Sequence, residues 1–162
     1  MKFAFSVGVG LLAFGLVATT ATSQDDIDPT LAKAIDARQA HMRLNAFNLG
    51  LLGAMAKGEI DYDAEAATAA AENLAALARM DESRYWLAGT DMETLGKDRT
   101  EALAAIWSEG SKIGDRAQTM TETSTAMAEA AGNGLESLRG AMGPLAKACG
   151  SCHEDFRLKD DK

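Results

Sequence analysis

Residues 135–157 read LESLRGAMGPLAKACGSCHEDFR, and this stretch determines the fold that we expect. Its apolar positions recur every three or four residues, which is the spacing of one face of an α-helix. The members of this seam are Leu135, Leu138, Met142, Leu145, Cys149, Cys152 and Phe156. Pro144 lies inside the run, so the helix either bends there or begins near it. We therefore predict an amphipathic helix at the C-terminal end of the chain.

The same spacing predicts three further helices, over about residues 29–57, 63–80 and 100–131. Gly58 and Gly132 follow the first and the third, and glycine is common where helices end. The inner seam of the first helix consists of Leu31, Ile35, Arg38, Met42, Asn45, Leu49, Leu52 and Ala56. Helices whose seams repeat every 3.5 residues pack at about 20° to one another, as in four-helix bundles.

The connections between these helices indicate how the bundle is ordered. Those after the first and third helices are short, which favours antiparallel neighbours. The segment 81–99 is longer and carries Tyr85 and Trp86, so we expect it to pack over the bundle. No strand pattern is visible. We therefore predict an all-α fold, an antiparallel up-down-up-down four-helix bundle.

The first 23 residues have the features of a removable secretion signal. Lys2 gives a positive start, residues 3–17 are apolar, and small residues precede Gln24. The apolar run is short and interrupted by glycine, which argues against an uncleaved membrane anchor. We expect a signal peptide at 1–23 and one bundle domain at 24–162, located in the periplasm with no membrane attachment.

The charge and length of the chain narrow its functional classes. The 162 residues suit one domain, and the formal net charge is −8. An acidic surface argues against nucleic acid and anionic membranes as partners. The charge favours a basic partner or small ligands and does not by itself name a function.

Cys149-Gly150-Ser151-Cys152-His153 forms the pattern C-x-x-C-H, which is typical of covalent haem c attachment. The two thiols add to the porphyrin vinyl groups, and the imidazole becomes an axial iron ligand. Positions i, i+3 and i+4 of a helix share one face, so all three side chains can meet one haem. We predict one covalently bound haem c, held by Cys149 and Cys152, with His153 as iron ligand.

Other readings of these residues fit less well. Cysteines at i and i+3 of a regular helix do not point at each other, which argues against a disulfide. A thiol–disulfide exchange pair of the thioredoxin kind would follow a strand, and none is predicted. A zinc site would have to borrow His41, and no ordered set of four ligands is evident.

Residues 146–157 resemble the C-terminal helix of class II c-type cytochromes, the cytochrome c′ family. Further similarities are Arg38-Gln39 followed by Met42, the helix end at 53–59, and Ile106-Trp107, so the resemblance covers nearly the whole exported chain. The resemblance implies a four-helix bundle with haem near the C-terminus. It also implies a haem protein without catalytic residues, and thus not an enzyme.

Members of this family differ in the residue that lies on the side of the haem opposite the histidine. In five-coordinate members an apolar residue lies there and small gases such as nitric oxide bind; in a low-spin branch a methionine binds the iron. Met42 matches that position, and the chain is most similar to the low-spin branch. We therefore expect an electron carrier with iron held by His153 and Met42. The alternatives are a five-coordinate gas-binding protein, with Met42 merely filling space, or His41 as the competing ligand.

An arginine on an inner helical seam needs a partner. The resemblance implies that Arg38 binds a haem propionate, whereas from the residues alone it could equally reach solvent or pair with a neighbouring helix. Arg157 either shields the histidine side of the haem or complements a helix end. The resemblance further implies redox partner proteins of unknown identity and a homodimer formed through the early helices.

Overall fold

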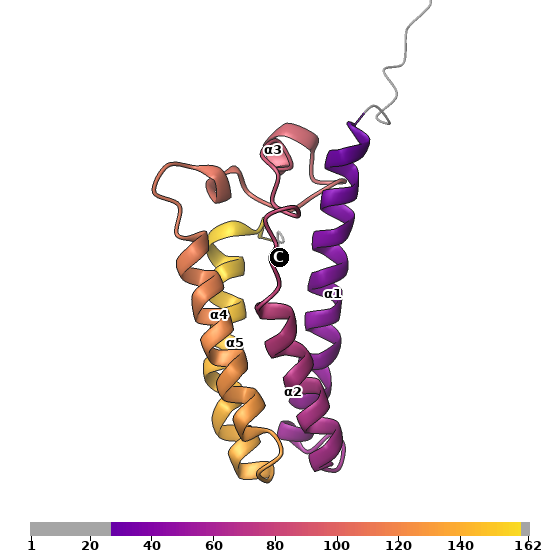
Figure 1. The fold of residues 1–162 in the computed structure, drawn as a ribbon, viewed down its shortest axis with the longest axis vertical. Helices are drawn as coiled ribbons and strands as arrows, with labels where there is room; N and C mark the ends of the chain where they lie inside the picture. Colours follow the sequence, from indigo (N-terminus) through magenta and orange to yellow (C-terminus); the bar gives the residue numbers. More distant parts are fainter. Residues whose placement is uncertain (1–26, 160–162) are drawn as a thin grey trace, which may run out of the picture.

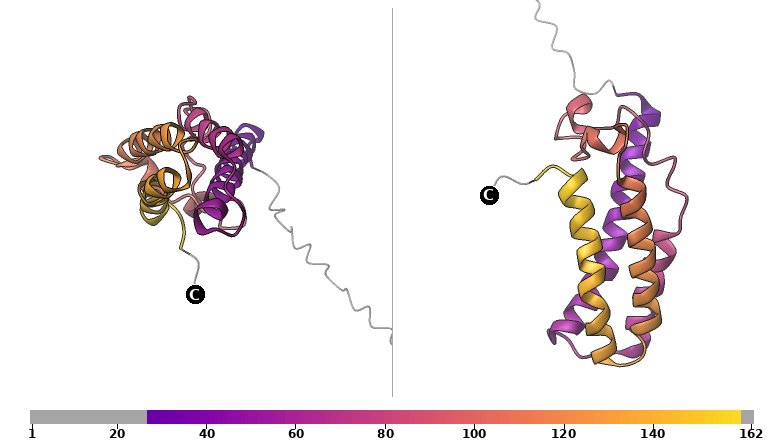
Figure 2. Two further views of the ribbon diagram at one scale, coloured as in Figure 1. Left: turned by 90° about the horizontal axis from the view of Figure 1, so that it is seen from below. Right: turned by 90° about the vertical axis from the view of Figure 1, so that its left-hand side faces the viewer.

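The computed structural model describes residues 27–159. Its elements are α1 (Pro29–Lys57), α2 (Ala64–Ala78), α3 (Met92–Leu95), a 3₁₀ turn (Ala104–Trp107), α4 (Ile113–Ala130) and α5 (Leu135–Phe156). In Figures 1 and 2 the long helices lie side by side, with α1 and α4 running one way and α2 and α5 the other. The prediction of an all-α, up-down-up-down bundle is confirmed. The predicted signal peptide at 1–23 lies outside the described residues.

The ends of α1 follow from its terminal residues. Asp28 accepts a hydrogen bond from the Thr30 amide at 2.7 Å, and Pro29 occupies the first helical turn, where its missing N–H costs nothing. Gly58 ends the helix with a φ of 75°, a conformation that glycine adopts without a side-chain clash. These bounds match the predicted residues 29–57.

The prediction of one helix over residues 100–131 is wrong at its start. The helix α4 begins only at Ile113, and Gly110, with a φ of 75°, separates it from the 3₁₀ turn. Ile106 is buried in a small cluster with Ala102 and Phe156. The Leu103 amide also donates to the Phe156 carbonyl at 3.0 Å. Packing against the end of α5 therefore replaces the helical continuation that the apolar spacing predicts.

Pro144 neither ends nor begins a helix. The helix α5 starts at Leu135 and continues through the proline to Phe156. The alternative in which the helix begins near Pro144 is therefore wrong. This continuity places Cys149, Cys152 and His153 on a single long helix.

The main core joins the four long helices toward the end where α1 meets α2 and α4 meets α5 (Figure 1). Its buried members are Leu52, Met55, Ala67, Ala70, Ala71, Leu74, Met127, Ala131, Leu138 and Leu145. Many are alanines, which let the helix backbones approach closely. Side chains nearer the other end of the bundle are left to line a cavity.

The segment between α2 and α4 covers that other end of the bundle. Tyr85 and Trp86 are half-buried, and Thr90 is fully buried. The indole N–H of Trp107 donates to the Trp86 carbonyl at 3.0 Å, which ties the two parts of the segment together. The expectation that this connection packs over the bundle is met. Among residues 27–159, no helix is both long and apolar enough to span a bilayer.

Candidate haem site

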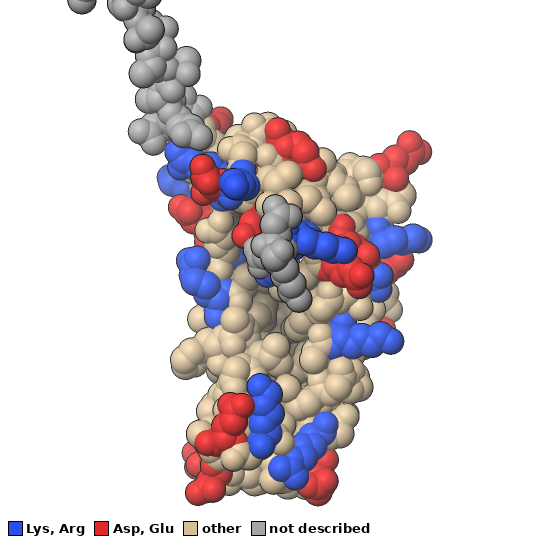
Figure 3. All heavy atoms as spheres, turned by 180° about the vertical axis from the view of Figure 1, so that it is seen from behind, with Lys and Arg blue, Asp and Glu red and all other residues tan. Residues whose placement is uncertain are grey.

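Two adjoining cavities lie between α1 and α5, one of about 530 Å³ and one of about 210 Å³. Both are lined by Met42, Ala46, Trp86, Ile113, Cys152 and His153. Figure 3 shows a hollow in the middle of one face of the molecule, with mainly uncharged atoms in it. The predicted ligand residues on α1 and α5 therefore line one continuous site.

The wall on α5 carries the C-x-x-C-H residues. Cys149 lines the smaller cavity, and Cys152 and His153 line both. The two cysteines are free thiols, and burial raises the pKa of each, which keeps them protonated. Partial burial and the nearby Arg157 guanidinium lower the pKa of His153, which favours the neutral imidazole that binds metals.

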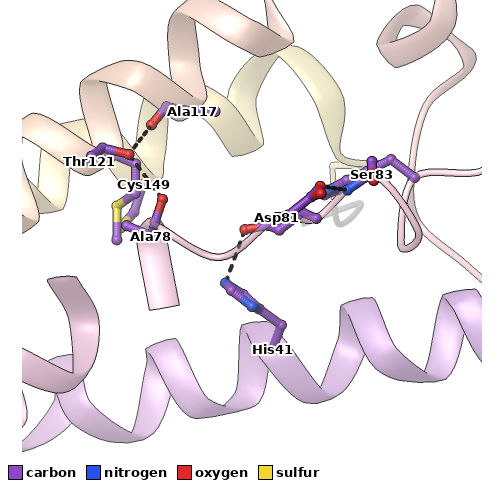
Figure 4. A network of polar contacts seen from close by, with 10 residues as sticks. His41, Ala78, Asp81, Ser83, Ala117, Thr121 and Cys149 are labelled. Atoms are coloured by element: carbon purple, nitrogen blue, oxygen red, sulfur yellow. Dashed lines mark hydrogen bonds and ion pairs between the residues drawn. The ribbon is translucent and has the colours of Figure 1, made fainter. Parts of the chain in front are cut away.

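Contacts with α4 hold this part of α5 in place. Arg116 donates to the Asp155 carboxylate through Nε at 2.9 Å and through Nη2 at 2.7 Å. The sulfur of Cys149 lies 3.8 Å from that of Met120. In turn, the Thr121 hydroxyl donates to the Ala78 carbonyl at 3.0 Å, which links α4 to the end of α2 (Figure 4). The attachment helix is thus fixed from the side away from α1.

The other readings of the two cysteines gain no support from this geometry. They sit at i and i+3 on a continuous helix, with no bond between them. A reactive dithiol needs a lowered thiol pKa, and here burial raises both. Over the described residues, no group of three or more His, Cys, Asp and Glu side chains is placed to hold a metal ion.

The opposite wall comes from α1. Met42 lines both cavities and is 36% exposed, although a methionine on an inner seam would ordinarily be covered. Asn45, Ala46 and Leu49 continue the wall in the smaller cavity. Met42 on α1 and His153 on α5 therefore line the same two cavities, and the binding of Met42 to iron stays a prediction.

His41 faces away from the cavities. Its side chain is 5% exposed, lines neither cavity, and places Nε2 3.3 Å from Oε1 of Glu82. Its ring centroid is 6.1 Å from that of Tyr85. Figure 4 shows the imidazole reaching from α1 toward the segment that follows α2. His41 is therefore not placed to be the competing iron ligand in this site.

Arg38 points inward, as the seam predicts, and is 4% exposed. Its Nη1 donates to Oγ1 of Thr90 at 3.1 Å, and its Nη2 donates to the Thr90 carbonyl at 3.1 Å and to Oγ1 of Thr100 at 2.8 Å. A longer contact of 3.4 Å reaches the Tyr85 carbonyl, and the guanidinium lies 4.7 Å from the Trp86 ring centroid. Arg38 thus fastens the covering segment to α1 and does not extend to solvent. Its contact with a propionate stays a prediction.

Apart from Arg157, the charged side chains at the rim of the larger cavity were not singled out from the sequence. The cations there are Arg43, Lys97, Arg99 and Arg157, and the anions are Asp98 and Glu101. Arg157 lies 3.7 Å from the Glu101 carboxylate. Because most of these residues lie in the irregular segment, no helical spacing marks them. An excess of cations in a chain of net charge −8 is a suitable surrounding for carboxylates such as haem propionates.

The residues present fit a haem c. Two thiols and an imidazole share one face of α5, the smaller cavity is mainly apolar, and cations surround the larger one. The buried Oδ1 of Asn45 also has no hydrogen-bond partner among the described residues. A site with these features suits a planar apolar ring that carries carboxylates at one edge.

Comparison with known proteins also points to a haem c protein. Residues 33–157 match the family model described as Cytochrome C'. A cytochrome c-554 from Cereibacter sphaeroides is 42% identical over 149 residues, covering 92% of this chain and 95% of the relative.

Solved structures agree with the sequence match. A cytochrome c′ from Rhodobacter sphaeroides has a TM-score of 0.76 and 37% identity, covering 80% of this chain and 98% of that chain. A nitric oxide complex of a cytochrome c′ variant from Alcaligenes xylosoxidans has a TM-score of 0.70 and 25% identity, covering 83% of this chain and all of that chain.

Proposed function

Because this chain belongs to the cytochrome c′ family, which binds one covalently attached haem c, we propose that it binds nitric oxide or a similar small gas at the haem iron. One observation carries the proposal. The cavity in front of His153 is bounded on its far side mainly by small or apolar side chains of α1. The nitric oxide complex of a similar cytochrome c′ supports it. The expectation of an electron carrier thereby becomes the second candidate.

Different residues of this chain would bind different parts of the haem. Cys149 and Cys152 would form the thioether links, and the neutral imidazole of His153 would bind the iron. The rim cations Arg43 and Lys97 are suited to the propionates. When bound, haem c supplies an iron that changes oxidation state and takes a small gas as ligand.

Met42 favours the second candidate, an electron carrier of the low-spin branch. Its side chain belongs to the α1 wall of the cavity that His153 also lines, and it is 36% exposed. A thioether ligand raises the reduction potential of haem iron and occupies the position that a gas would need. The two functions therefore differ in whether Met42 leaves that position open.

Titration of the reduced protein with nitric oxide separates the two candidates. The parent protein is compared with Met42→Ala and with Met120→Ala, which removes the same side chain from the α4 wall of the same cavity. We expect the parent and both variants to bind nitric oxide with similar affinity. If only Met42→Ala binds it readily, Met42 is an iron ligand and the electron carrier is correct.

Attachment of the haem is tested separately by mass spectrometry of the intact protein. The parent should carry the mass of one haem, and a Cys149→Ser, Cys152→Ser double variant should lose it on acid–acetone extraction. A parent chain without covalent haem would contradict both candidates.

We further propose that the chain is exported to the periplasm and cleaved after residue 23, which the N-terminal sequence of the isolated protein tests. The apolar side chains of Leu44 and Phe47, 52% and 77% exposed on α1, support the expected homodimer. Solved cytochromes c′ include one with ligand-controlled dimer dissociation. Sedimentation with and without nitric oxide measures the state of this chain.

A further inference from the structure

The amide of Asn45 is an unexplained polar group inside the site. Asn45 lies on α1, three residues after Met42, and lines the smaller cavity together with Cys149 and His153. Its Oδ1 is buried and has no hydrogen-bond partner within the described part of the chain. A buried polar atom left without a partner is costly and calls for an explanation. An unpartnered amide on the wall of a ligand cavity points to a partner outside the described residues, which the amide reaches by turning about its last side-chain bond.

A neighbouring amide on the same helix shows the contrast. Asn48 is 6% exposed, and its Nδ2 donates to the Leu44 carbonyl at 2.8 Å. Its Oδ1 accepts from Nδ2 of Asn73 on α2 at 3.1 Å. Asn48 does not line the cavity. The Asn48 amide is therefore bonded at both its nitrogen and its oxygen, whereas Oδ1 of Asn45, a residue of the cavity wall, has no partner within the described residues.

We infer that Asn45 hydrogen-bonds to the small ligand on the haem iron and so favours ligands that can take part in that bond. This inference rests on the proposed gas binding. A ligand on the side of the iron away from His153 would lie against the α1 wall, where Asn45 is accompanied by Met42, Ala46 and Leu49. Of these four side chains, only the amide is a strong hydrogen-bonding group, with a donor end and an acceptor end.

The charged groups that line the same cavity already have partners. Glu82 accepts a hydrogen bond from Nε1 of Trp86 at 2.8 Å. Arg116 is held by the Asp155 carboxylate at 2.7 Å and 2.9 Å. Neither side chain is on α1. The amide is therefore the polar group best placed to meet an iron-bound ligand.

The amide can serve two ligand classes. Rotation about its last side-chain bond would present either Oδ1, as an acceptor for a water molecule on ferric iron, or Nδ2, as a donor to the oxygen of nitric oxide. Hydrogen-bond donors and steric access on this side decide which ligands a haem retains. Loss of one such bond should speed nitric oxide dissociation on the order of 3- to 10-fold.

The test uses the stretching frequency of carbon monoxide bound to the reduced haem protein, since a donor near the oxygen lowers that frequency. Asn45→Leu keeps the volume of the side chain and removes its hydrogen-bonding groups. It is compared with the parent, and Met42→Ala/Asn45→Leu is compared with Met42→Ala. The second pair lacks Met42, so it tests the amide even if Met42 binds the iron in the parent. Failure of the proposed function would then appear as carbon monoxide binding only without Met42. Failure of this inference would appear as an unchanged frequency in both pairs.

We expect Asn45→Leu to raise the carbon monoxide frequency and to speed nitric oxide dissociation. Asn48→Leu, the matched control, should lower the stability of the protein and leave both ligand readouts unchanged. The inference is overturned if the frequency is the same with and without the amide in both backgrounds. It is equally overturned if no carbon monoxide binds even to Met42→Ala, because then no ligand reaches Asn45.

Discussion

Replacing Arg38 should destabilise the protein more than any exposed substitution on α1. The guanidinium makes three hydrogen bonds of 2.8–3.1 Å to Thr90 and Thr100 and lies over the Trp86 ring. Arg38→Met keeps the apolar stem and leaves these acceptors without their charged donor. Each bond to a charged group contributes about 1.5–3 kcal/mol, and removal of one member of a buried polar set typically costs 3–5 kcal/mol.

We therefore expect Arg38→Met to lower the free energy of unfolding by about 4 kcal/mol. This is a large part of the 5–15 kcal/mol typical of a folded domain. For a chain of this size, it corresponds to a fall of about 2 M in the urea midpoint. The assay is equilibrium unfolding of the haem-loaded protein in urea, followed by far-ultraviolet circular dichroism.

Two variants control this measurement. Lys33→Met removes an exposed cation of α1 that lines neither cavity and should change stability by less than about 0.5 kcal/mol. Arg38→Lys keeps the charge with one nitrogen in place of the fork and should fall between Arg38→Met and the parent. If Arg38→Met unfolds at the same urea concentration as Lys33→Met, Arg38 does not fasten the covering segment.

Two further predictions concern polar contacts outside the cavity. Tyr62→Phe should cost about 1–2 kcal/mol in urea unfolding, because the hydroxyl donates to the Ala131 carbonyl at 2.8 Å and accepts from the Gly134 amide at 3.0 Å; an unchanged midpoint would show that solvent replaces both bonds. Burial alone would raise the pKa of Asp91, but hydrogen bonds from the Thr94 hydroxyl and amide outweigh it and hold the pKa below the usual 3.8. Asp91 thus stabilises the fold above pH 3.8 and loses that effect as the pH falls through its lowered pKa. Asp91→Asn should accordingly be less stable than the parent at neutral pH, with a deficit that shrinks on acidification; a deficit independent of pH would contradict this.

The long helices were predictable because their signals are local. Asp28 and Gly58 mark the ends of α1, and the seam of α5 alone places Cys149 and His153 on one face. The start of α4 was not predictable. Ile106 keeps the helical spacing but is buried against the end of α5, and nothing in the local sequence signals that contact.

In the candidate site, too, the features set by helical spacing were predictable and the contacts with distant segments were not. Met42 and Asn45 follow from the inner seam of α1, since helical spacing places both toward the cavity. The partners of Arg38 do not follow, because Thr90 and Thr100 lie 52 and 62 residues away in an irregular segment. Spacing thus predicts which way a helical side chain faces, and the fold decides which groups it meets.

The most direct test of the central claim is the spin state of the ferric haem in the purified parent protein, measured by electron paramagnetic resonance. A haem bound by His153 alone, with its α1 side open to a gas, should give a high-spin ferric signal at neutral pH. A low-spin signal that becomes high-spin in Met42→Ala would show that Met42 occupies the iron. It would contradict gas binding as the primary function and establish the electron carrier in its place.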